Sequence, residues 1–326
     1  MARRLRLALS VLGLALVSAV GDCHVAVYVD AANASGVEDG SKAHPYTTIQ
    51  KAIDQTSIPV AVVIAPGTYA GFTVSARSGL SFQAAGATKP VIDGTALMST
   101  LITITGSTDI ELRGLAIQVN QRDAVLVTNG STATLAGVTI DGPPAPPWPS
   151  SPPTCRLVVA DPGTAVTIDG SVLTGGRVAV YQLGPSSLVN VRRGSVFSDN
   201  YTGVWLLDGA NFDIAGSTIE YSSDCGVLGG SNASPGTVNI HSGTSIRWPG
   251  RLGIAMNAEM TTTISDSEIQ VGTSATALNS QHTGSTVVAT DSTFDGGQWG
   301  RAGRLVRRVS RAGPLHGEER EPRGFV

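Results

Sequence analysis

The sequence predicts an all-β protein built as a parallel β-helix, a solenoid in which short strands stack coil upon coil. Three observations favour this fold class. Alternating apolar residues lead into a glycine or aspartate about every 24 residues, a second short strand recurs within each period, and aromatic residues make up only 5% of the chain. Small aliphatic side chains suit the narrow interior of such coils. Each coil is stable only when it stacks on its neighbours, so we expect a long array of eight coils or more.

The first 21 residues have the pattern of a secretory signal. Arg3, Arg4 and Arg6 precede a mostly apolar run of 14 residues, Leu7–Val20. This run is shorter than the roughly 20 residues that span a bilayer, but it fits the apolar core of a signal peptide. We therefore predict a signal peptide at residues 1–21, no transmembrane span, and a protein that is secreted, periplasmic or held at the cell surface.

One short helix is expected after the signal. Ile49, Ala52 and Ile53 place apolar groups on one helical face, and Gln50 and Lys51 lie on the other. Such a helix can cover the open end of the first coil, where no neighbouring coil buries the interior.

The segment around this helix resembles the start of secreted right-handed parallel β-helix proteins of the pectate lyase-like superfamily. The resemblance is carried by Val27–Asn33 (VYVDAAN), Asp39–Ser41 (DGS), Pro45–Ile53 (PYTTIQKAI) and Ile64–Tyr69 (IAPGTY). Together with the coils it covers residues 25–296. It implies a right-handed β-helix, and it indicates the fold far more specifically than the activity.

The coil pattern predicts one β-helix domain over residues 22–296. The recurring glycine or aspartate lies at Gly114, Gly137, Gly170, Gly194, Gly216, Gly243, Asp266 and Asp291. The successive intervals are 23, 33, 24, 22, 27, 23 and 25 residues. A β-sandwich predicts no such period, and the leucine-dense consensus of a leucine-rich repeat is absent.

The 33-residue interval contains a proline-rich insertion at residues 142–156. Proline cannot donate to a sheet ladder, so we expect this segment to leave the coil as a loop. Trp148 lies within it. This side chain either stacks on a bound sugar ring or packs on the solenoid wall.

Charge is unevenly distributed along the chain. Residues 22–296 carry 12 basic and 22 acidic residues, a net charge of −10, whereas residues 297–326 carry seven arginines and three glutamates. The acidic body argues against nucleic acid as a partner, because such binding depends on neutralising phosphates. The arginine-rich end has little apolar surface to bury, so we predict a basic disordered tail over residues 297–326.

The resemblance also implies the chemistry to look for. Lyases of this superfamily need a Lys or Arg base, usually with carboxylates that hold calcium, and the related hydrolases need a Gly-His-Gly segment. All three lysines, Lys42, Lys51 and Lys89, lie in the N-terminal third, and no Gly-His-Gly segment occurs. The sequence therefore leaves open whether the protein is an enzyme.

Stacking the coils brings one group of polar residues together. Aligning the strands that follow them places Tyr201, Asp224 and Arg251 in one column at successive coils, and Arg122 in the same column two coils before Tyr201, with Gly176 between. Neighbouring coils lie about 4.8 Å apart, so we expect Asp224 to pair with Arg251. Two interpretations stay open: Arg251 or Tyr201 acts as a base or binds a substrate carboxylate, or the column is a ladder of stabilising cross-coil pairs.

Carboxylates near this column suggest calcium as a cofactor, held by Asp199, Glu220 and Asp224. The three cysteines are an odd number for an oxidising compartment. We hypothesise that Cys155 and Cys225 form a disulfide and that Cys23 carries a lipid anchor, although Asp22 departs from the small residue expected before a lipidated cysteine.

We therefore expect an exported, monomeric β-helix protein that binds a polysaccharide or surface glycan, as a carbohydrate-binding or adhesive protein. Arg122, Trp148 and Asp224 are the candidate substrate-binding residues. The alternative is a calcium-assisted uronate polysaccharide lyase that uses Arg251 or Tyr201 for β-elimination.

Overall fold

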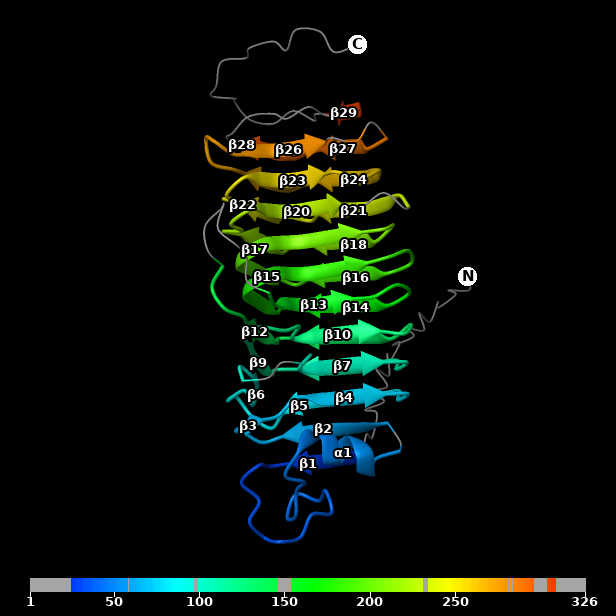
Figure 1. Cartoon of the computed structure of the whole chain (residues 1–326), viewed down its shortest axis with the longest axis vertical. Helices are drawn as coiled ribbons and strands as arrows, with labels where there is room; N and C mark the ends of the chain where they lie inside the picture. The colour runs from blue at the N-terminus through cyan, green and yellow to red at the C-terminus, as the bar shows by residue number, and fades with distance from the viewer. Residues whose placement is uncertain are drawn as a thin grey trace, which may run out of the picture.

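The computed structural model is a parallel β-helix of about nine turns, as the sequence predicts. It describes residues 25–57, 59–96, 99–145, 154–230, 234–280, 282 and 284–295, together with the backbone of residues 304–308. Figure 1 shows the coils stacked along one axis, from β1 (Val25–Val29) at one end to β29 (Arg304–Arg308) at the other.

The strands of the stacked coils form three parallel ladders, and most coils contribute to all three. The first ladder is the 12-stranded sheet of β1, β2 (Val60–Ile64), β5 (Leu80–Ala84), β8 (Ile110–Arg113), β11 (Thr132–Ala136), β14 (Ala165–Asp169), β16 (Leu188–Arg192), β18 (Asn211–Ala215), β21 (Gly236–His241), β24 (Met260–Ser265), β27 (Thr286–Thr290) and β29. The second ladder contains β3 (Thr68–Tyr69), β6 (Val91–Gly94), β9 (Ala116–Val119), β12 (Thr139–Asp141), β19 (Thr218–Glu220), β22 (Thr244–Arg247), β25 (Ser267–Gln270) and β28 (Thr293–Asp295). The third ladder contains β4 (Phe72–Ser75), β7 (Ile102–Thr105), β10 (Val125–Thr128), β13 (Arg156–Ala160), β20 (Cys225–Gly230), β23 (Leu252–Met256) and β26 (Thr276–Ser280).

Two strands belong to both the second and the third ladder. β15 (Val172–Leu183) and β17 (Val196–Leu207) are each 12 residues long and run through the corner that separates these ladders in other coils. They join the two ladders into one 17-stranded sheet.

The recurring glycine or aspartate of the sequence lies at the corner between the first and second ladders. All eight of these residues have positive φ. For example, φ is 65° at Gly114, 61° at Gly137, 46° at Asp266 and 49° at Asp291. Glycine adopts this left-handed conformation without steric cost, and aspartate is among the few other residues that tolerate it. The regular spacing of these residues along the sequence therefore marks the sharp backbone turn that recurs in each coil.

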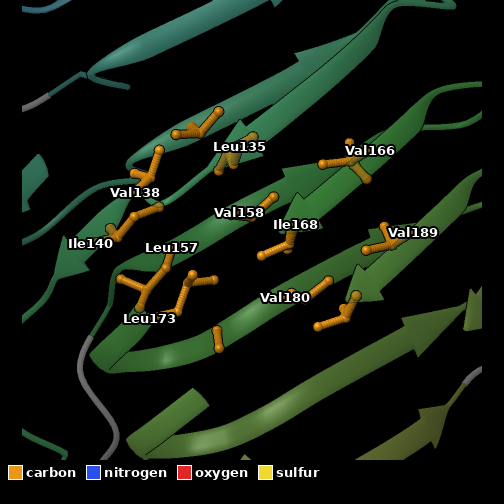
Figure 2. Close-up of a cluster of buried hydrophobic side chains, with 14 of the residues drawn as sticks. Leu135, Val138, Ile140, Leu157, Val158, Val166, Ile168, Leu173, Val180 and Val189 are labelled. Carbon is orange, nitrogen blue, oxygen red and sulfur yellow. The ribbon is translucent and has the colours of Figure 1, made fainter. Parts of the chain in front are cut away.

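Aliphatic side chains stack in register through the interior. In the first ladder Leu135 pairs with Ile168 and Ile168 with Val191, and all three are fully buried. Figure 2 shows this arrangement, with side chains from successive coils filling the space between the ladders. Each such side chain contributes about 1.5–3 kcal/mol by its burial, so stacking supplies the main stabilisation.

Buried hydroxyl groups bond the backbone at the same corner. Ser171 Oγ accepts from the backbone N–H of Val138 (3.0 Å) and lies 3.0 Å from the Leu135 carbonyl oxygen, to which it can donate. In the next coil, Ser195 Oγ accepts from the Ser171 N–H (3.2 Å). These hydroxyl groups supply hydrogen-bond partners to backbone N–H and C=O groups that have no partner in the ladder because of the turn.

The predicted N-terminal helix is present as α1 (Ile49–Gln55). Thr48 caps it by accepting a hydrogen bond from the Lys51 N–H (3.2 Å), and Ile49, Ala52 and Ile53 form its buried face. The helix packs against β1, β2 and β4 at the end of the stack, visible in Figure 1. No helix in the described part of the chain is long and apolar enough to cross a bilayer.

The remaining segments partly differ from expectation. The insertion at 142–156 lies between β12 and β13, and its residues 146–153, with Trp148, fall outside the described residues. The signal segment 1–21 and Cys23 also fall outside them. Residues 304–308 of the predicted disordered tail instead form β29, which pairs with β27. The backbone of this part of the tail therefore extends the first ladder by one strand.

Candidate functional site

The predicted column forms at the corner where the chain enters the third ladder. Pairing of Thr202 with Cys225 and of Cys225 with Leu252 places Tyr201, Asp224 and Arg251 at successive coils. The Asp224 N–H donates to the Tyr201 carbonyl (2.8 Å), and the Arg251 N–H donates to the Asp224 carbonyl (3.0 Å).

The expected contact between Asp224 and Arg251 forms. Arg251 Nε donates to Asp224 Oδ1 at 2.6 Å, and the carboxylate is only 8% exposed whereas the guanidinium side chain is 45% exposed. This hydrogen bond raises the pKa of Arg251. Burial, followed by the nearby charge of Asp224, raises the pKa of the Tyr201 hydroxyl. Both shifts favour the protonated forms, which suits binding of an anion and opposes action as a general base at neutral pH.

Arg122 lies in the same column, but its neighbours differ from those expected. Asp123 occupies the position of Arg156, Arg156 pairs with Val178, and Val178 pairs with Thr202. Arg122 is therefore three coils before Tyr201, and Cys155 and Arg177 lie between them rather than Gly176. The insertion at 142–156 caused this error, because it separates β13 from the rest of its coil and the alignment of third-ladder strands passed over β13.

The outer face of the third ladder carries a hollow of about 270 Å³ beside this column. Three arginines, Arg122, Arg156 and Arg177, line it together with Tyr181 and Trp205. Among the described residues of the lining, Asp123 is the one acidic residue, so these residues carry a net positive charge on a body that is acidic as a whole. We call this hollow the arginine groove.

Side chains in the arginine groove hold one another in place. Arg156 makes two hydrogen bonds to Asp123, from Nε to Oδ1 (2.7 Å) and from Nη2 to Oδ2 (2.5 Å), and its guanidinium lies 4.6 Å from the centroid of the Tyr181 ring. The guanidinium of Arg177 lies 5.5 Å from the Trp205 centroid. The two rings meet edge to face at 5.6 Å. Planar cations over fixed rings present donors at defined positions, which is the arrangement that recognises carboxylates.

Two of these arginines are available to a ligand. Arg122 and Arg177 are exposed, and neither forms an ion pair with another described residue. Arg156, in contrast, is held by Asp123. The groove thus offers two guanidinium groups for an anion, positioned beside one fixed Arg–Asp pair.

Sequence reasoning missed Arg156, Arg177, Tyr181 and Trp205. The signal was present, because Val180 and Val204 hold equivalent positions in the apolar segments 178–181 and 203–206, and aligning them places Tyr181 beside Trp205 on the outer face. The register confirms that alignment, with Tyr181 paired to Trp205.

The predicted calcium ligands do not converge. Glu220 pairs across the second ladder with Ser198 and Arg247, Asp224 is bonded to Arg251, and Asp199 is exposed at the corner. Among the residues that the structure describes, no three His, Cys, Asp or Glu side chains are grouped as a metal site. These three carboxylates therefore do not form a preorganised calcium site.

The predicted disulfide is also absent. Cys155 and Cys225 are both buried free thiols. The register places Cys155 beside Arg177 and Cys225 beside Thr202, so the cysteines lie three coil steps apart, about 14 Å at 4.8 Å per step. A disulfide requires Cα atoms within about 7 Å.

Comparison with known proteins gives one family and several similar folds. A family model described as "Protein of unknown function (DUF1565)" matches residues 32–270. The pectate lyase Pel9A aligns with a TM-score of 0.56 and 13% identity over 86% of this chain and 79% of that chain. A GH136 lacto-N-biosidase from Eubacterium ramulus aligns with a TM-score of 0.42 and 10% identity over 81% of this chain and 56% of that chain. The catalytic domain of a GH87 α-1,3-glucanase aligns with a TM-score of 0.40 and 12% identity over 78% of this chain and 58% of that chain. No curated protein matches the sequence significantly. At these identities the likeness to Pel9A concerns the fold alone.

Proposed function

The chain belongs to the DUF1565 family, and we propose that it is an exported glycan-binding protein whose arginine groove holds an acidic polysaccharide. The observation that carries this proposal is the groove itself, with Arg122 and Arg177 available beside the rings of Tyr181 and Trp205. Uronate residues present both features that such a site selects. Their carboxylates accept two hydrogen bonds from a guanidinium, and their ring C–H groups pack on aromatic faces.

The position of the groove supports a polymer as ligand. Continuing along the corner from Arg177, the next coils place Tyr201 and Asp224, which are buried, and then Arg251, whose side chain is 45% exposed. A chain that runs parallel to the solenoid axis therefore meets exposed guanidinium groups at Arg177 and again at Arg251. Since the chain shares its fold with the pectate lyase Pel9A, pectate fragments are the first ligands to test.

Arg177 is the appropriate residue for the test. We would measure binding of oligogalacturonate and oligoalginate to the full chain by calorimetry, comparing wild type with Arg177→Gln. Loss of a charge-assisted hydrogen bond of about 1.5–3 kcal/mol weakens binding about 10- to 100-fold. Arg193→Gln is the matched control, because Arg193 is 82% exposed and follows β16 at a different corner.

Two results would count against the proposal. One is the absence of binding by wild type to either acidic oligosaccharide. The other is equal weakening by Arg177→Gln and Arg193→Gln, which would indicate attraction to general surface charge. Binding should also weaken as salt rises, since the contacts are charged.

A uronate lyase that uses Arg251 or Tyr201 is the second candidate function, and the raised pKa of both groups disfavours it. Incubation with pectate or alginate and calcium, followed by ultraviolet absorbance of unsaturated products, distinguishes the two functions. We expect no product. Product formation by wild type that Tyr201→Phe or Arg251→Gln abolishes would establish the lyase instead.

A further inference from the structure

Two aromatic rings stack on the surface at the corner between the second and third ladders, on two coils that contribute no residue to the lining of the arginine groove. Tyr221 directly follows β19 and Trp248 directly follows β22 in the next coil, where the second ladder ends. Their ring centroids are 5.0 Å apart and the ring planes differ by 26°. Tyr221 is 50% exposed and Trp248 is 42% exposed, so neither ring is buried in the core.

The backbone at both residues is in a conformation that large side chains avoid. Tyr221 has φ of 52° and Trp248 has φ of 47°. In the two preceding coils the same corner position is held by Gly175 (φ 66°) and Asp199 (φ 56°), as the pairing of Thr174 with Ser198 and of Ser198 with Glu220 shows. Glycine and aspartate are the residues expected there, whereas a bulky aromatic residue at positive φ is an outlier.

This strain is not offset by burial of the rings. Side chains held in costly backbone conformations cluster at ligand sites, so an outlier of this kind is grounds for a functional hypothesis. Here two such residues occur at neighbouring coils and bring their rings together in solvent.

Polar groups beside the rings define the ligand chemistry. The Arg247 guanidinium lies 6.0 Å from the Trp248 ring centroid and 3.4 Å from Glu268 Oε2. Glu220 is the cross-strand neighbour of Arg247. An exposed apolar face bordered by one cation and two carboxylates matches a sugar ring, which has apolar C–H faces and hydroxyls that both donate and accept. The two carboxylates disfavour binding of a negatively charged sugar, such as a uronate, at these rings.

We propose that Tyr221 and Trp248 form a second glycan site, which takes the apolar face of a neutral sugar residue and places its hydroxyls against Arg247 and Glu268. The proposal rests on the proposed function only in taking a glycan as the partner. It assigns different coils of the same corner and a different class of sugar, so the protein binds neutral residues at Tyr221 and Trp248 and uronate residues in the arginine groove.

The test uses substitutions that suit the backbone. Tyr221→Asn/Trp248→Asn removes both rings and installs a residue that tolerates positive φ, so we expect the midpoint of urea unfolding to stay unchanged or rise. Affinity for neutral oligosaccharides is expected to fall about tenfold or more, the equivalent of a lost aromatic contact. Asp199→Asn is the matched control, because it makes the same kind of change at the same corner without removing a ring.

The full chain would be tested against cellohexaose, mannohexaose, chitohexaose and maltohexaose, with oligogalacturonate alongside. We expect at least one neutral hexamer to bind wild type and Asp199→Asn equally and the double variant weakly. Arg177→Gln should leave that binding unchanged while it weakens binding of oligogalacturonate, so the two proposals fail independently.

Three results would overturn the inference. Wild type binding none of the neutral hexamers would do so, as would equal binding by the double variant. A lower unfolding midpoint in the double variant with unchanged glycan affinity would show that the ring pair is a structural contact between coils.

Discussion

Removal of Arg251 should destabilise the protein more than removal of its partner, Asp224. The Asp224 side chain is 8% exposed and that of Arg251 is 45% exposed. Arg251→Met therefore leaves a carboxylate that water hardly reaches, whereas Asp224→Asn leaves a guanidinium that is already half in solvent. The uncompensated buried charge is the larger penalty.

The magnitude follows from these exposures. Breaking a fully buried ion pair costs about 3–5 kcal/mol, and exposed pairs contribute about 0–1 kcal/mol. Because one partner of this pair is buried and the other is not, we expect Arg251→Met to lower the free energy of unfolding by about 2 kcal/mol and Asp224→Asn by about 1 kcal/mol or less. Arg193→Met is the control, since Arg193 is 82% exposed and its loss should stay within about 0.5 kcal/mol.

Equilibrium unfolding in urea, followed by circular dichroism, measures all three variants. Solenoids lose cooperativity when coils unfold separately, so the slope of the transition must be compared as well as its midpoint. Equal losses from Arg251→Met and Asp224→Asn would refute the reasoning, because the carboxylate would then be hydrated. Losses no larger than that of Arg193→Met would show the pair to be an ordinary surface contact.

Three further outcomes are expected. Ser171→Ala should lower the free energy of unfolding by about 1–3 kcal/mol, because it leaves the buried Val138 N–H without its acceptor; Ser81→Ala, in a partly exposed position, is the control in the same urea titration. Gly226→Ala should cost about 1–3 kcal/mol by overpacking, since a Cβ there would lie 2.7 Å from the Gly253 carbonyl oxygen, and an unchanged urea midpoint would contradict the close approach of these coils. Burial raises the pKa of the Cys225 thiol from 9.0 to about 12, so between these values the unfolded chain loses a proton that the folded chain keeps. The free energy of unfolding should therefore fall by up to about 1.4 kcal/mol per pH unit above pH 9, and Cys225→Ala should remove that part of the slope; equal slopes in both proteins would argue against the shift.

The sequence was sufficient for the fold because one backbone requirement is repeated in every coil. Gly114 and Asp266 mark the same left-handed turn, and residues that tolerate such a turn are few. The column of Tyr201, Asp224 and Arg251 was also predictable, since each of these residues lies two places before a glycine, and these glycines, Gly203, Gly226 and Gly253, hold equivalent positions in the third ladder.

The arginine groove was harder to predict. Arg156 begins a strand that a long insertion separates from the rest of its coil, and β15 carries Arg177 through a corner without the polar turn that marks other coils. Tyr181 also looks like an ordinary strand residue until its outer-face neighbour is known. The disulfide prediction failed because Cys155 and Cys225 lie at the same corner but three coils apart along the solenoid axis.

The two long strands also bear on how fast and how tightly a ligand binds. Tyr181 and Trp205 lie on β15 and β17, which cross their corner as continuous hydrogen-bonded strands. Because these strands are continuous and hydrogen-bonded, the two rings have few alternative conformations in the free protein. Little conformational entropy is therefore lost when a glycan binds. We expect the groove to have nearly the same shape before and after binding, with association limited by encounter and affinity differences among ligands expressed mainly in their dissociation rates.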